Sequence, residues 1–197
     1  MLRVAQQQVV YRYLLADSWY ASAENMTLVR ALGHHFLFAL ESSRTVALNA
    51  AMRAQGQFQA VQSLVFPDTQ LVCGYLRSVQ VAVLVSRQVF TTQDGSPGVL
   101  YLVSSDTDLD QARLTTIYPR WWKVEEYHKS LKQNASMAKS LTKTLATQAT
   151  HFFAAVLAYT KLEVLKRKCG IGHFRLKAQL YTVGLRAMYP QLALLRA

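Results

Sequence analysis

The first forty residues carry three segments of different hydrophobic pattern. An apolar, β-prone run spans 9–16 and ends at Asp17. Residues 18–32 then place apolar side chains at helical spacing, with Asp17 and Ser18 available as caps, and a second apolar run covers 35–40. The pattern predicts a strand, a helix and a strand, and two strands joined by such a crossover are expected to be parallel.

The pattern changes from residue 41 to residue 105. Its β-branched and aromatic runs are short, and turn residues separate them, most clearly Pro67-Asp68 and the stretch 94–98. This pattern predicts antiparallel strands. The predicted strands cover residues 45–48, 58–66, 71–75, 79–90 and 99–104.

Longer apolar periodicities follow residue 105 and predict helices. Gly184 and Pro190 are the points where the last of them is expected to be interrupted. The predicted helices cover 109–132, 141–168 and 174–195. The chain is therefore expected to be α/β, and its predicted parts are an α/β segment (1–40), a β-rich segment (41–105) and a helical segment (106–197).

Charge adds a function class to this fold. The 197 residues include 22 Lys and Arg against 11 Asp and Glu, a net charge of +11. With 51% hydrophobic residues the chain is not a disordered basic tail, so the charge belongs to a folded body. Such a body is expected to bind phosphates, on nucleic acid first and on anionic lipid second.

No apolar stretch approaches the roughly 20 residues that a bilayer-spanning helix requires. The first residues also lack the apolar core of a signal peptide, so we expect a cytoplasmic protein with no membrane partner. Cys73 and Cys169 are isolated, which predicts buried or idle thiols and no zinc site.

Three acidic features are candidates for chemistry: Asp17 at a strand end, the series Asp106, Asp108 and Asp110, and the pair that begins at Glu125. The aspartate series precedes a predicted helix, so capping explains it without a metal. For Asp17 alone, capping and a functional role are equally good explanations.

The helix around Glu125 is rich in aromatic and basic residues. At 3.6 residues per turn, one face carries Tyr118, Trp121, Glu125, His128 and Lys132. This face is either solvated, with Glu125 paired to Lys129 and His128, or it holds a metal beside a DNA backbone.

The aromatic residues of the helical part divide between core and surface in this interpretation. We expect Trp122 and Tyr127 to lie mainly in the core and Trp121 to be partly exposed. Phe152 and Phe153 are expected to pack within a long core helix.

Tyr118, Glu125 and Lys132 keep the spacing of a Tyr-x-x-Arg-x-x-x-Glu-x-x-x-x-x-x-Lys signature. The chain thereby resembles the bacterial insertion-sequence DDE transposases that carry a β-strand insertion in an RNase H-like core. The run 122–133 is similar to the same family nearly residue for residue, and Asp17 is similar to its second catalytic aspartate, at a strand end.

The resemblance implies the C-terminal part of an RNase H-like core, with 41–105 as an antiparallel β insertion and a helical C-terminal region. It implies that Asp17 and Glu125 are catalytic metal ligands in a site where three carboxylates hold two Mg²⁺ ions for strand cleavage and strand transfer. The implied partner is double-stranded DNA at transposon terminal inverted repeats, in the bacterial nucleoid. The implied DNA-binding residues are Tyr118, Arg120, Lys129 and Lys132.

Two departures from the family's pattern change this expectation. The sixteen residues before Asp17 leave no room for the earlier strand that carries the family's first aspartate, and Trp121 stands where the signature has Arg. We therefore expect a truncated, catalytically incomplete transposase fragment, whose sheet has an exposed edge that invites pairing with another chain.

The alternative is a non-catalytic DNA-binding protein, or a modulator that forms homo-oligomers or mixed oligomers with a full-length transposase. A third interpretation is a basic protein whose charge serves only solubility.

Overall fold

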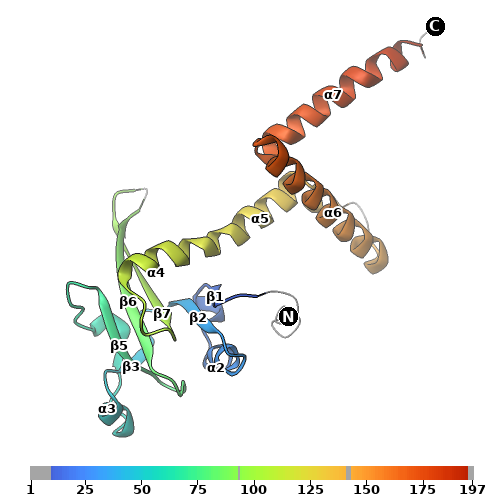
Figure 1. Ribbon diagram of the computed structural model, residues 1–197. Coiled ribbons are helices and arrows are strands. Elements are labelled where there is room, and N and C mark those ends of the chain that lie inside the picture. Colours follow the sequence, from blue (N-terminus) through green and yellow to red (C-terminus); the bar gives the residue numbers. More distant parts are fainter. Residues whose placement is uncertain (1–9, 93, 141–142, 195–197) are drawn as a thin grey trace. The chain divides into compact units, whose positions relative to one another are not determined.

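The computed structural model describes residues 10–92, 94–140 and 143–194. It divides into two compact units, residues 1–121 (unit 1) and 122–197 (unit 2), which are described separately below. Unit 1 contains a mixed β-sheet with helices, and unit 2 contains helices (Figure 1).

The sheet of unit 1 has seven strands in the order β1-β2-β7-β6-β5-β3-β4. The strands are β1 (Tyr13–Ala16), β2 (His35–Leu40), β3 (Thr45–Ala47), β4 (Gln59–Ala60), β5 (Leu71–Leu76), β6 (Val83–Thr91) and β7 (Pro97–Ser104). β1 and β2 are parallel and joined through α2 (Ala23–Ala31), which confirms the predicted crossover. The remaining pairs are antiparallel, so strands from 1–40 and 41–105 share one sheet. The three-part division stays a prediction.

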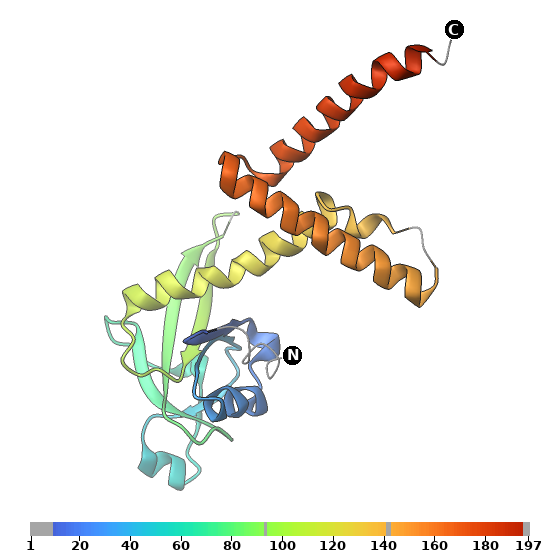
Figure 2. The same cartoon turned by 45° about the vertical axis from the view of Figure 1, so that its right-hand side comes forward.

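Helices cover both faces of this sheet. Phe36 and Phe38 of β2 are fully buried in a cluster that includes Met26 of α2. Leu37, between them, faces the opposite cluster with Leu114 of α4 (Gln111–Ile117). Figure 2 shows α4 passing across the sheet. Alternate side chains of a strand point to opposite faces, so a strand buried on both faces is continuously apolar, as β2 is.

The caps of the first helical segments differ from the prediction. Asp17 caps a short 3-10 helix, η1 (Ser18–Tyr20), by accepting a hydrogen bond from the Trp19 amide at 3.1 Å. The cap of α2 is Ser22, whose Oγ accepts from the Asn25 amide at 3.1 Å. The strand before Asp17 begins at Tyr13, and residues 1–9 lie outside the described part of the chain.

The prediction of one strand over 58–66 is wrong for most of that segment. Only β4 pairs, and a 3-10 turn, η2 (Val61–Ser63), follows it at once. The Ser63 hydroxyl donates to the Ala60 carbonyl at 2.7 Å and closes this turn. α3 (Ala50–Ala54), which Asn49 caps, is a helix that the sequence pattern did not predict.

The predicted helix over 109–132 is broken by Pro119. Proline lacks an amide hydrogen and clashes with the preceding turn, so a helix seldom continues through it. The segment consists of α4, the 3-10 helix η3 (Tyr118–Trp121) and α5 (Trp122–Gln133). The predicted strand over 79–90 is shifted to β6 (Val83–Thr91), and a turn in which Ser78 adopts a left-handed conformation (φ 68°) follows β5.

Unit 2 consists of α5, the 3-10 helix η4 (Met137–Lys139), α6 (Leu145–Cys169) and α7 (His173–Leu194). Its small core joins Leu131 and Ala135 to Ala155, with Tyr127 packed against them, as predicted for Tyr127. The predicted interruption of the last helix is wrong, because α7 runs through Gly184 and Pro190.

Several predictions about burial are also wrong. Trp122 is 60% exposed, and Phe152 and Phe153 are 46% and 69% exposed. Trp121 is partly exposed, as predicted.

Cys73 and Cys169 are free and exposed. Among the described residues, no helix has the length and apolar character needed to cross a bilayer.

Candidate functional site

Asp17 lies where the two parallel strands of the sheet end. It directly follows β1, and because β1 and β2 are parallel, both carboxyl ends lie at the same edge of the sheet. Ligands of open α/β sheets commonly bind at this edge. The Asp17 carboxylate is half-buried, and its Oδ1 accepts from the Trp19 amide, so capping accounts for one of its two oxygens.

Tyr118 belongs to the surroundings of Asp17. Burial and, as the smaller contribution, the negative charge of Asp17 together raise the pKa of the Tyr118 hydroxyl to about 12. The ring of Trp121 stacks on Tyr118 with 6.4 Å between centroids and 9° between planes. Two predicted site residues that are distant in sequence, Asp17 and Tyr118, are thus brought together within unit 1.

Asp106 occupies the opposite end of β1. Its Oδ2 accepts hydrogen bonds from the Tyr13 hydroxyl at 2.5 Å and from Arg12 Nη2 at 3.2 Å. Burial alone would raise the pKa of Asp106, but hydrogen bonds from Tyr13 and the Asp108 amide, with the charges of His35 and Arg12, lower it.

The role of Asp106 is therefore structural. Tyr13 is the first residue of β1, and Asp17 follows the last. The two residues are therefore about 13 Å apart along the strand, at 3.3 Å per residue. Because Asp106 is bound to Tyr13, it does not join Asp17 in one site. Asp110 is a cap of α4, as predicted, and its carboxylate accepts from the Arg113 amide at 2.7 Å.

The described residues do not form a cluster of three or more His, Cys, Asp or Glu side chains that fits a metal ion. Capping leaves Asp17 with one free carboxylate oxygen. A two-metal site needs several such oxygen ligands, so Asp17 alone does not form one.

Glu125, Lys129 and Lys132 lie on α5 in unit 2, and all three side chains are exposed. The expected pairing of Glu125 with Lys129 and His128 is wrong: among the described residues, the ion pair on this helix joins Lys123 Nζ to Glu126 Oε2 at 2.7 Å. The hydrogen bond from Lys123 lowers the pKa of Glu126. Arg120 is exposed on η3 in unit 1.

A buried polar network, which the sequence analysis missed, holds α5 against the other helices of unit 2. His173 of α7 lies 2.6 Å from Ser130 Oγ through Nδ1 and 2.9 Å from Glu163 Oε2 of α6 through Nε2. Asn134 Nδ2 donates to the same Ser130 oxygen at 3.1 Å. The Ser130 and His173 side chains are buried, so the network fixes the helix that carries Glu125.

The two units differ sharply in charge. Residues 122–197 contain 13 Lys and Arg against three Glu, a net charge of +10, whereas residues 1–121 contain nine basic and eight acidic residues. All nine basic residues of unit 1 are arginine, and the first lysine of the chain is Lys123. Arginine presents a planar set of donors that matches a phosphate in two-point contacts.

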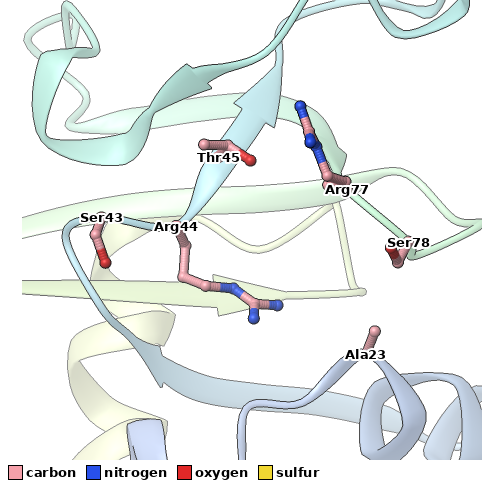
Figure 3. A pocket seen from close by; sticks show the side chains of 6 residues that line it. All are labelled: Ala23, Ser43, Arg44, Thr45, Arg77 and Ser78. Atoms are coloured by element: carbon pink, nitrogen blue, oxygen red, sulfur yellow. The ribbon is translucent and has the colours of Figure 1, made fainter. Parts of the chain in front are cut away.

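A pocket lined by Arg44 and Arg77 was also missed by the sequence analysis (Figure 3). Three separate segments of unit 1 build it, so no local pattern marks it. The one sequence signal that points to it is the exclusive use of arginine in unit 1.

Comparison with known proteins identifies the family. No curated protein matches the chain. The family model described as a transposase DDE domain matches residues 2–161, which include Asp17, Tyr118, Glu125 and Lys132. This match covers most of the chain and confirms the resemblance to insertion-sequence DDE transposases. The chain therefore belongs to the transposase DDE domain family.

Proposed function

We propose that the chain binds double-stranded DNA at transposon ends as part of a DDE-type transposition reaction. The family match over residues 2–161 carries this proposal. The charge of +10 on residues 122–197 supports it, because contacts to the phosphate backbone dominate the affinity of DNA-binding proteins. The proposed contacts are Tyr118, Arg120, Lys129 and Lys132, and the proposed location is the bacterial nucleoid.

In this proposal Asp17 and Glu125 correspond to two of the three carboxylates that would hold the catalytic metal in a complete site of this family. Members of this family typically use a divalent metal ion, and carboxylate oxygens suit Mg²⁺. Asp17 follows a strand at the end of a parallel pair, which is the position of the family's second aspartate. Residues 1–40 then correspond to part of an RNase H-like core, 41–105 to the β insertion and 106–197 to the helical region.

We further propose that the chain does not cleave DNA alone and works as a homo-oligomer or with a full-length transposase. Two observations support this. The buried carboxylate of Asp106 is engaged with Tyr13 at the far end of β1. Trp121, at the position of the signature Arg, stacks on Tyr118 and offers no guanidinium to a phosphate.

The test measures binding and cleavage of terminal inverted-repeat DNA by the purified chain in Mg²⁺. We expect binding whose log K falls with log salt by about 0.9 per phosphate neutralised, and cleavage no greater than that of Glu125→Gln. The control is Glu126→Gln, which removes a neighbouring carboxylate that pairs with Lys123. Absence of DNA binding at low salt contradicts the proposed function.

Cleavage by the unaltered chain that Glu125→Gln abolishes and Glu126→Gln preserves would refute the proposed incompleteness and establish a nuclease.

The second candidate function is a non-catalytic modulator of a full-length transposase. The stacked Trp121 is the observation that favours it, because it removes the donor that would seat the reacting phosphate. A modulator lowers the rate of transposition by a full-length enzyme when the two are mixed. Stimulation of that rate would contradict this candidate.

A further inference from the structure

The pocket of Arg44 lies on unit 1, close to the turn that follows Asp17. Its volume is about 250 Å³. Figure 3 shows the guanidinium of Arg44 extending toward Ala23, the first residue of α2. The side chain of Arg77 points away from the Arg44 guanidinium. The residues that line the pocket are Ala23, Ser43, Arg44, Thr45, Arg77 and Ser78.

Among the described residues, the side chain of Arg44 has no hydrogen-bond or ion-pair partner, and the same holds for Arg77 and Arg120, whose side chains are exposed. The other described arginines of unit 1 are engaged: Arg12 with Asp106, Arg30 with the His34 carbonyl, Arg53 with Gln80, Arg87 with Gln70 and Arg113 with Asp110. Arg44 is half-buried. A guanidinium removed from part of its water without an acceptor is unfavourable, and an anion in the pocket would supply that acceptor.

The other groups around the pocket suit a phosphate. Ser43, Thr45 and Ser78 contribute hydroxyl groups, which donate to phosphate oxygens. Arg77 adds a second positive charge, and its guanidinium lies over the ring of Phe58 at 4.9 Å from the centroid. The pocket itself has no acidic side chain in its lining.

A second, smaller pocket of about 180 Å³ lies at the turn that follows Asp17 and shares Arg44 with the first. Arg44 lines both pockets, and the smaller one also includes Ser18 and Trp19, the two residues that follow Asp17, with the exposed Glu41 at its rim. The Trp19 ring is 86% exposed, and exposed aromatic rings are platforms for nucleobases. A DNA strand that passes Asp17 with an unpaired base can thus stack that base on Trp19 and place a neighbouring phosphate at Arg44.

We propose that Arg44 binds a backbone phosphate of a DNA strand beside Asp17, with Arg77 as supporting charge and Trp19 as a stacking surface for the adjacent base. This assignment rests on the proposed function, since it takes the ligand to be DNA. It adds a contact in unit 1 to those proposed on the basic helices.

The test compares Arg44→Gln with Arg113→Gln in the full chain, using a short fluorescein-labelled DNA duplex over a range of salt concentrations. Both variants remove one positive charge from unit 1, but Arg113 is exposed and paired with Asp110 at 3.9 Å. We expect Arg44→Gln to reduce the slope of log K against log salt by about 0.9, the loss of one phosphate contact. Arg113→Gln is expected to keep the slope, and Arg77→Gln to weaken binding less than Arg44→Gln.

The outcomes separate this assignment from the proposed function. If the unaltered chain binds DNA and Arg44→Gln keeps its slope, the pocket assignment is wrong and DNA binding stands. If the unaltered chain does not bind DNA, both are wrong. If inorganic phosphate shifts the Arg44 Nε–H resonance while the slope stays unchanged, the pocket holds free phosphate, and the assignment to DNA is overturned.

Discussion

The phenol hydroxyl of Tyr13 is expected to stabilise unit 1 through its hydrogen bond to Asp106. The substitution Tyr13→Phe keeps the ring and removes the donor that lies 2.5 Å from the buried carboxylate. Burial first, and then this hydrogen bond, raise the pKa of Tyr13 from 10.0 to about 12. Two pKa units correspond to about 2.7 kcal/mol, and a hydrogen bond to a charged group is worth roughly 1.5–3 kcal/mol. Since burial accounts for part of the shift, we expect Tyr13→Phe to cost about 2 kcal/mol at pH 7.

The cost should depend on pH in a defined direction. The pKa of Asp106 is lowered in the folded protein, so its contribution is present above the unfolded pKa, about 3.9, and is lost as the pH falls through the folded pKa. The difference between Tyr13→Phe and the unaltered chain should therefore shrink toward pH 3. It should also shrink as the pH rises from about 10 through about 12, where Tyr13 ionises.

The assay is amide hydrogen exchange of peptides from β1 and β2, which reports the opening of unit 1 separately from unit 2. Tyr11→Phe is the matched control, because the Tyr11 hydroxyl is buried without a hydrogen-bond partner in the part of the chain that the structure describes. Removing an orphaned hydroxyl is expected to be neutral or stabilising. Equal losses in the two variants, or a loss for Tyr13→Phe that stays constant down to pH 3, would refute the reasoning.

Two further predictions concern the surroundings of Asp17 and the sheet. Asp17→Asn should lower the pKa of Tyr118 from about 12 but leave it above 10, because the burial remains. ¹³C NMR of labelled tyrosine, with the Tyr118 signal assigned from Tyr118→Phe, measures this pKa. An unchanged pKa would show that Asp17 does not act on Tyr118. Gly74→Ala should destabilise unit 1 by about 1–3 kcal/mol, because a Cβ there would lie 2.7 Å from the Ala47 carbonyl oxygen. Gly184 lies on a helix with open space around it, so Gly184→Ala should instead stabilise α7 by about 1 kcal/mol. Amide hydrogen exchange measures both effects. Protection that rises in both variants, or falls in both, would contradict these two predictions.

The part of the fold that the sequence predicts correctly is the part determined by local periodicity. The parallel pair β1 and β2 with α2 between them follows from two apolar runs and one helical stripe. The break at Pro119 was missed because apolar spacing continues across it, although proline chemistry predicts the break. The exposure of Phe152 was missed because α6 is apolar around much of its circumference, so its sequence does not reveal which face packs.

The candidate site divides in the same way. Asp17 and Glu125 are proposed as site residues from their motifs, and the charge of Asp17 contributes to the raised pKa of Tyr118. The bond from Tyr13 to Asp106 and the pocket of Arg44 join segments far apart in the chain, which no pattern along the sequence encodes. Such contacts depend on the order of strands in the sheet, and that order becomes known only with the structure.

The absence of lysine before Lys123 makes the two units chemically separable. A protease specific for lysine has its first site at Lys123, in the first turn of α5 and two residues after unit 1 ends, where the Lys123 side chain is 73% exposed. Such a digestion can remove the basic helices while leaving every peptide bond of the sheet intact. Amine-reactive labels will likewise mark unit 2 and the chain's N-terminus and spare the side chains of unit 1. The contributions of the two units to the proposed DNA binding can therefore be measured without redesigning the protein.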